Sequence, residues 1–92
     1  MHVHASGPEG RASIDGALTL RNVSALRDEI GTRCSDCLAL EIDLAGVTEI
    51  DAAGVQWMAM ARRGWMVRFV NPSAPVVRML EFIHDVQLLP AP

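Results

Sequence analysis

Two cysteines with two residues between them are the feature of this chain that most suggests chemistry. Cys34 and Cys37 form a C-x-x-C motif, which can supply redox-active thiols or half of a zinc site. A redox pair of this kind opens a helix directly after a strand, because the helix dipole then lowers the thiol pKa. Here the motif follows a predicted helix, and only His2, His4 and His84 could complete a zinc site. We therefore interpret the motif as a loop with two incidental thiols, with no metal and no cofactor.

Other candidates for catalysis are weaker. Glu41 and Asp43 share one face of a predicted strand and could act as paired carboxylates, but solvated residues on an open sheet face explain them better. No Ser or Cys has a His and an acid at predictable reach, so no triad can be assembled. The chain has no lysine and no G-x-x-x-x-G-K-[ST] phosphate loop. We predict that the protein is not an enzyme.

The composition describes one small globular domain. The chain has 92 residues, 50% of them hydrophobic, and a formal net charge of −3. Its eight basic residues are all arginines and form no stripe, which argues against nucleic acid as a partner. No apolar run is long enough to insert in a membrane and no signal peptide is evident, so we expect a cytoplasmic protein without a structural disulfide. We divide the chain into residues 1–10, a flexible arm or edge strand, and residues 11–92, the single domain.

Hydrophobic periodicity predicts alternating strands and helices. Strands are expected at residues 11–15, 38–44 and 66–70, helices at 20–30, at 52–63 and from Ser73 to His84, and a last short edge strand at 86–89. This order predicts an α/β fold with a mostly parallel or mixed sheet. The strand at 38–44 has one apolar face and one face with two acids, which favours helices on one side of an open sheet.

The turn that begins at Asp51 is the candidate site. Asp51 is expected to cap the helix at 52–63, as Thr19 is expected to cap the helix at 20–30. The helix at 52–63 is apolar nearly all round, so we expect it to be mostly buried, with its first turn exposed at the carboxyl end of a strand. Gly54 would let a partner or another helix approach closely. The alternative is a capped helix start that only stabilises the fold.

The same stretch resembles the signature of the bacterial STAS (anti-sigma-factor-antagonist-like) family, in which Asp-Leu-x-Gly-Val and Asp-Ser-x-Gly precede a buried helix. Residues 42–47 read Ile-Asp-Leu-Ala-Gly-Val, and residues 51–54 read Asp-Ala-Ala-Gly. Residues 16–19, Gly-Ala-Leu-Thr, and residues 70–72, Val-Asn-Pro, extend the resemblance to roughly residues 11–89. It implies a STAS-like fold, a mixed open sheet of about four strands with helices mainly on one face.

For function, the resemblance implies a non-enzymatic module that binds another protein. In anti-sigma factor antagonists the start of the buried helix binds an anti-sigma factor kinase. Phosphorylation of the Ser after the Asp ends that complex, because about two negative charges enter the interface. Here Ala52 replaces this Ser, Ala53 offers no hydroxyl and Thr48 lies in the preceding loop, so no phosphorylation switch is expected at this position. Thr19 also replaces an Asp that the family often carries.

Three functions remain open within this family. An anti-sigma factor antagonist of degenerate type would regulate transcription and bind its kinase constitutively or under another control. A subunit similar to the MlaB-type STAS protein would bind the ATPase subunit of an ABC transporter for phospholipids. A nucleotide-binding STAS domain fits less well, because Asp51 would repel a phosphate at the helix start.

Both protein-binding interpretations predict one partner surface. It comprises Thr19, Arg21, Asn22, Asp51, Ala52, Ala53 and Gly54. Asp51 is expected to order the turn, while Ala52 and Ala53 provide flat apolar contact. Arg62 and Arg63, at the far end of the same helix, are further candidates.

Overall fold

The structure is a computed structural model that describes residues 1–83 of the chain. Its elements are β1 (His2–Ser6), β2 (Glu9–Leu18), α1 (Leu20–Arg33), β3 (Ala39–Ile50), α2 (Ala52–Gly64), β4 (Met66–Val70) and α3 (Ala74–Phe82). The predicted α/β fold is confirmed. The strand expected at residues 86–89 and the helix end expected at His84 lie outside the described residues.

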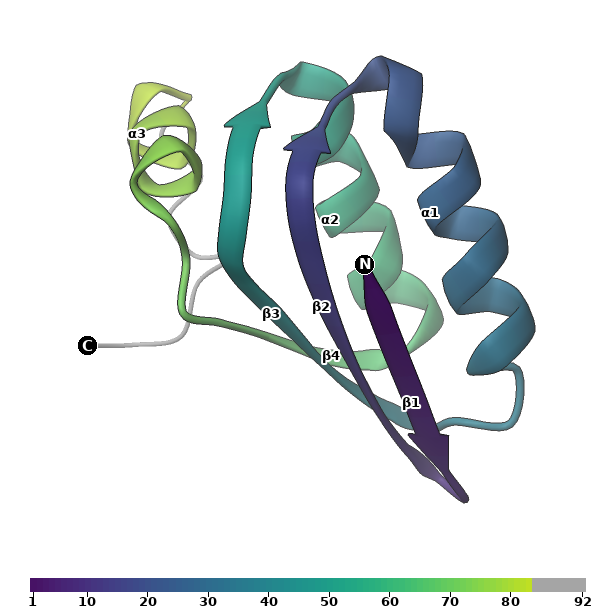
Figure 1. Ribbon diagram of the computed structural model, residues 1–92. Helices are drawn as coiled ribbons and strands as arrows, with labels where there is room; N and C mark the ends of the chain where they lie inside the picture. Colours follow the sequence, from purple (N-terminus) through teal and green to yellow (C-terminus); the bar gives the residue numbers. More distant parts are fainter. Residues whose placement is uncertain (84–92) are drawn as a thin grey trace.

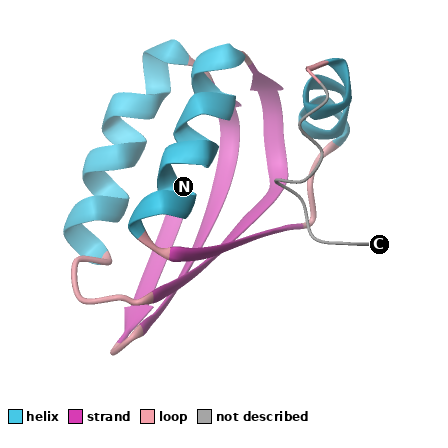
Figure 2. Cartoon of the chain, turned by 180° about the vertical axis from the view of Figure 1, so that it is seen from behind, coloured by secondary structure: helices cyan, strands magenta, loops and turns pink. Residues whose placement is uncertain are grey.

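The described strands form one mixed sheet with helices mainly on one face, as predicted. Its order is β1-β2-β3-β4; β1 is antiparallel to β2, whereas β2, β3 and β4 are parallel. α1 and α2 lie against one face of the sheet and α3 lies beside β3 (Figures 1 and 2). Of the two alternatives for residues 1–10, the edge strand is observed, because β1 pairs with β2 from His2↔Ser13 to Ser6↔Glu9.

A single hydrophobic core lies between the sheet and the helices. Alternate residues of β2 and β3 point into it, because successive strand side chains face opposite sides of a sheet. The most deeply buried side chains are Leu18, Ile30, Cys34, Leu40, Ile42, Leu44, Val47, Met58, Phe69, Val76 and Leu80. The opposite face of the sheet carries exposed side chains such as Arg11 and Arg68, so only one face is covered.

Both central strands are longer than the sequence predicts. β2 begins at Glu9 and passes Gly16, where the alternation predicted its end. Gly16 has a φ of 89° and the pairing of β2 with β3 shifts register beside it, so this glycine accommodates an irregularity within the strand. β3 extends to Ile50, and Thr48, predicted in a loop, therefore occupies an exposed strand position.

The helix ends also differ from the prediction. α1 passes Gly31 and ends at Arg33, whose guanidinium pairs with Glu29 one turn earlier. Thr19 stands at the N-cap position of α1 as predicted, and Ser73 stands at that of α3, but neither side chain makes a capping hydrogen bond. For α1, a more distant side chain takes over this role.

α2 is only half buried, contrary to the prediction. Gln56 is exposed and Met60 is 57% exposed, because these residues lie on the side of α2 that faces away from the core. Leu20, the first residue of α1, is 73% exposed. Leu38 is 69% exposed because it precedes the first residue of β3.

Within residues 1–83, no helix has both the length and the apolar character needed to cross a bilayer.

Candidate functional site

The starts of α1 and α2 lie side by side at one end of the sheet (Figure 1). β2 and β3 are parallel neighbours that end at Leu18 and Ile50, so the helices that follow them begin at the same edge. The amide of Asp51 donates a 3.4 Å hydrogen bond to the carbonyl of Leu18, which extends the strand pairing to this edge. Two helix N-termini, each with backbone amides that lack helical partners, therefore meet in one place.

The Asp51 carboxylate joins the two helix starts. The Gly54 amide donates to Asp51 Oδ1 at 3.0 Å, which is the predicted cap of α2. The Leu20 amide, 31 residues away in the chain, donates to Asp51 Oδ2 at 3.1 Å. These amides, with that of Leu20 first and that of Gly54 second, hold the pKa of Asp51 below its ordinary value. One side chain thus caps both helices and fixes their relative position.

Gly54 is needed by the fold itself. It is buried, and a Cβ at this position would clash with the Leu18 carbonyl oxygen and come within 2.9 Å of Ile50 Cγ1. Within the chain, the close approach predicted for Gly54 is made by β2. Gly54 positions the site, while the accessible surface belongs to its neighbours.

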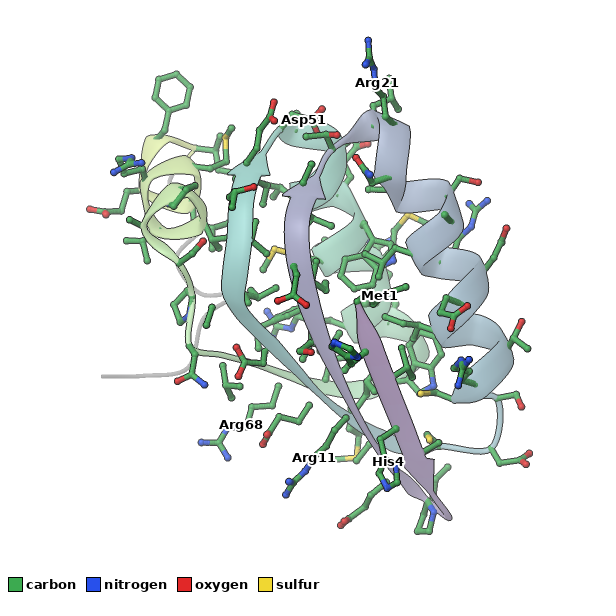
Figure 3. All side chains as sticks on the ribbon, in the orientation of Figure 1. Met1, His4, Arg11, Arg21, Asp51 and Arg68 are labelled. Carbon is green, nitrogen blue, oxygen red and sulfur yellow. The ribbon has the colours of Figure 1, made fainter. Side chains whose placement is uncertain are left out.

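The predicted partner residues at the start of α1 gather beside Asp51. Thr19 Oγ1 donates to Asn22 Oδ1 at 2.8 Å, which closes the first turn of α1 in place of a backbone cap. A shallow hollow of about 590 Å³ is lined by Thr19, Arg21, Asn22 and Asp51, together with Ala17, Leu20 and Glu49. In Figure 3, Arg21 projects outward from the end of the molecule at which Asp51 lies. The structure therefore brings these residues from two distant segments together.

The α2 side of this end is apolar. Ala52 is exposed and Ala53 is half-buried, so the first turn of α2 presents methyl groups and no hydroxyl. Arg62 and Arg63 are also exposed, but they lie in the last turn of α2. At about 1.5 Å of rise per residue, roughly 15 Å separates them from Ala52 along the helix axis. The structure does not bring the two arginines into this site.

An apolar groove between α1 and α2 is the feature that the sequence interpretation missed. It has a volume of about 400 Å³, and Leu20, Val23, Ala53, Trp57, Met60 and Trp65 are among its lining residues. The helical spacing of these residues was the available signal. For the helix at 52–63 that spacing predicts burial, whereas part of its apolar surface lies beside α1 and remains accessible.

The two cysteines belong to the core. Both thiols are free and buried, and a Cβ at Gly10 would lie 3.0 Å from Cys37 Sγ and 3.1 Å from Cys34 Sγ. Burial, followed by the neighbouring Cys37 thiol, raises the pKa of Cys34 to about 11. No group of three or more possible metal ligands occurs within residues 1–83. The motif lies between α1 and β3 as predicted, but its thiols fill space in the core.

Asp43 has a structural role on the open side of the sheet. Its Oδ1 accepts from the Ala45 amide at 2.8 Å, and its Oδ2 accepts from Asn71 Nδ2 at 3.0 Å. The pKa of Asp43 is lowered by the Ala45 amide first and by Asn71 second. Asp43 therefore lies on the open sheet face, and its carboxylate also ties β3 to Asn71, the residue that follows β4.

Comparison with known proteins agrees with this architecture. A family model described as "Mlab, STAS domain" matches residues 1–86. Among solved structures, the STAS domain of a SulP transporter from Vibrio cholerae is similar, with 16% sequence identity and a TM-score of 0.63. This similarity covers 95% of the present chain and 72% of the other, and it shows the fold. No curated protein matches the chain significantly. The chain belongs to the STAS domain family, as its sequence signature predicts.

Proposed function

We propose that this STAS domain binds a partner protein through the paired helix start formed by Thr19, Arg21, Asn22 and residues 51–54. STAS domains are in general protein-interaction modules. The observation that carries the proposal is the double cap, in which one carboxylate accepts the amides of Leu20 and Gly54. It holds two helix starts in one rigid, exposed surface, and a preorganised surface loses little entropy on binding.

The chemistry of this surface suits docking better than catalysis. Asp51 is occupied by two backbone amides, and the Thr19 hydroxyl donates to Asn22. Ala52 and Ala53 add flat apolar contact but no nucleophile. Arg21 supplies an exposed positive charge at the rim, where it would steer a partner and set its orientation.

For the partner, we propose the ATPase subunit of an ABC transporter for phospholipids, as for the MlaB-type STAS proteins that the chain resembles. The description of the matching family model supports this choice. Ala52 has no hydroxyl, and this also supports an ABC ATPase as the partner, because a permanent subunit needs no phosphorylation switch.

An anti-sigma factor kinase is the second candidate. It is supported by the position of Ala52, which lies in the exposed first turn of α2 where the resemblance places the phosphorylated Ser of that family. With Ala at this position, the complex would lack that off-switch and would persist.

A matched pair of substitutions tests the proposed surface. Ala52 and Ala74 are each the first residue of a helix and each exposed, so Asp is compatible with the helix dipole at both positions. Tagged wild-type, Ala52→Asp and Ala74→Asp chains are used to purify partners from combined cytoplasmic and membrane extracts, with quantitative mass spectrometry. We expect Ala52→Asp to lose a partner that the wild type and Ala74→Asp retain. Equal retention by all three chains would refute the proposed surface.

The identity of the retained protein decides between the two partners. An ABC ATPase retained by the wild type and lost by Ala52→Asp supports the transport role. A kinase-like anti-sigma factor with the same pattern supports transcriptional regulation instead.

A further inference from the structure

The groove between α1 and α2 begins at the proposed partner surface. Leu20 and Ala53 line its first part, and Trp65, which directly follows α2, lies at its other end. Leu20 and Met60 remain 73% and 57% exposed in this position. Large apolar side chains that line an open groove are typical of a surface that another molecule covers.

The shape of the groove fits one α-helix. α1 contributes Leu20, Val23 and Arg27, at positions i, i+3 and i+7, and α2 contributes Ala53 and Met60, seven residues apart. The groove thus follows one face of each helix for at least about two turns, or roughly 11 Å. Apolar grooves between helices recognise amphipathic helices whose own anchors repeat at i, i+3 or i+4 and i+7.

The charge of the groove defines its occupant further. Arg27 is the one charged residue of its lining, and it is exposed. Among residues 1–83, no carboxylate lies within ion-pair distance of Arg27; the nearby Glu29 pairs with Arg33. A helix laid over the groove would take Arg27 partly out of water. That is favourable only if the helix supplies a carboxylate.

We propose that an amphipathic helix of the partner protein lies in this groove, with an apolar stripe against Leu20, Trp57 and Met60 and a carboxylate beside Arg27. This inference rests on the proposed function, because the helix would extend the contact that begins at Ala53. It adds the secondary structure, the apolar pattern and the charge of the segment by which the partner binds.

Both tryptophans of the chain, Trp57 and Trp65, line the groove and report on its occupancy. A phage-displayed library of 16-residue helical peptides is selected on the full chain. The best peptide is then synthesised with Glu, Gln or Lys at its acidic position, and tryptophan emission gives the affinities. We expect selected peptides with apolar residues at i, i+3 or i+4 and i+7 and a carboxylate, with affinities in the order Glu, Gln, Lys. Failure to select such peptides would overturn the inference.

Matched variants place the peptide on the chain. Met60→Glu introduces a carboxylate into the groove, whereas Met66→Glu does so at a 78% exposed methionine on β4. We expect Met60→Glu to weaken binding by at least about tenfold and Met66→Glu to leave it unchanged. Arg27→Glu is expected to reverse the order of the Glu and Lys peptides, and the exposed α3 variant Arg78→Glu to preserve it. Binding that is insensitive to both Met60→Glu and Arg27→Glu would overturn the inference.

Two other results would also overturn it. If sedimentation shows that the free chain is a dimer and that Met60→Glu makes it monomeric, the occupant is a second copy of the chain. If Ala52→Asp releases the cellular partner but Met60→Glu does not, the proposed function stands and the groove is not part of the interface. If Met60→Glu alone releases the partner, the groove stands and the proposed surface around Ala52 fails.

Discussion

The two ends of β3 join strands to helices in opposite ways. At the carboxyl end, the half-buried Asp51 carboxylate caps α1 and α2 by hydrogen bonds and leaves the surrounding surface accessible. At the amino end, the buried thiols of Cys34 and Cys37 pack against Gly10, and Trp65 Nε1 donates to the Cys34 carbonyl at 3.2 Å. Hydrogen-bonded caps can order surface residues and leave them accessible, whereas packed side chains bury the surface that they contact. This difference favours the carboxyl end as the binding end.

Of the changes that test this comparison, replacing Gly54 at the carboxyl end is expected to have the largest effect on stability. Helix propensity alone predicts that Gly→Ala in a helix stabilises the protein by about 1 kcal/mol. Gly54→Ala should instead destabilise it by more than about 3 kcal/mol, because the Cβ would clash with the Leu18 carbonyl oxygen. Gly31 in α1 has open space around a Cβ, so Gly31→Ala is the control and should be stabilising. A urea midpoint that Gly54→Ala raises, as Gly31→Ala should, would refute the close contact of α2 with β2.

Replacing Gly10 should have a smaller effect at the amino end. The Cβ of Gly10→Ala would meet the ends of side chains, at 3.0 Å from Cys37 Sγ and 3.1 Å from Leu40 Cδ1, and these can shift. We expect destabilisation by about 1–2 kcal/mol. Combined with Cys37→Ala, the cost should be less than the sum of the two single changes, because the second change removes the obstructing sulfur. Additive costs would show that the thiol does not press on Gly10.

Removing the double cap should have the smallest effect on stability. Asp51→Ala should lower Tm by roughly 5 °C, and Asp51→Asn by less, because the amide oxygen can still accept one hydrogen bond. Folding lowers the pKa of Asp51 below its ordinary value. The carboxylate therefore contributes fully to stability above the ordinary pKa, and this contribution is lost as the pH falls through the folded-state pKa. Thermal melts between pH 7 and pH 3 should therefore converge for wild type and Asp51→Asn at low pH. A constant difference in Tm would contradict the role of the carboxylate charge.

Much of this architecture follows from local sequence signals. Alternation at Leu40, Ile42 and Leu44 identifies the central strand, and Asp51 at the head of an apolar helix identifies the α2 cap. These signals act over a few residues, so sequence reasoning can use them. The STAS signature adds the expected order of the elements.

The remaining features depend on contacts between distant segments. The bond from the Leu20 amide to Asp51 links residues 31 positions apart, and the contact between Gly54 and the Leu18 carbonyl depends on how α2 crosses β2. Helical periodicity identifies an apolar face but not what covers it. For that reason the sequence does not show that Leu20 and Met60 line a groove instead of the core.

Hydrogen–deuterium exchange of the chain with and without its purified partner tests the central claim most directly. We predict added protection in peptides that cover residues 19–23 and 51–57, and none in those that cover residues 9–13 or 34–40. Protection confined to residues 34–40 or to the open face of the sheet, with none at residues 51–57, would contradict the assignment of the paired helix start as the binding surface.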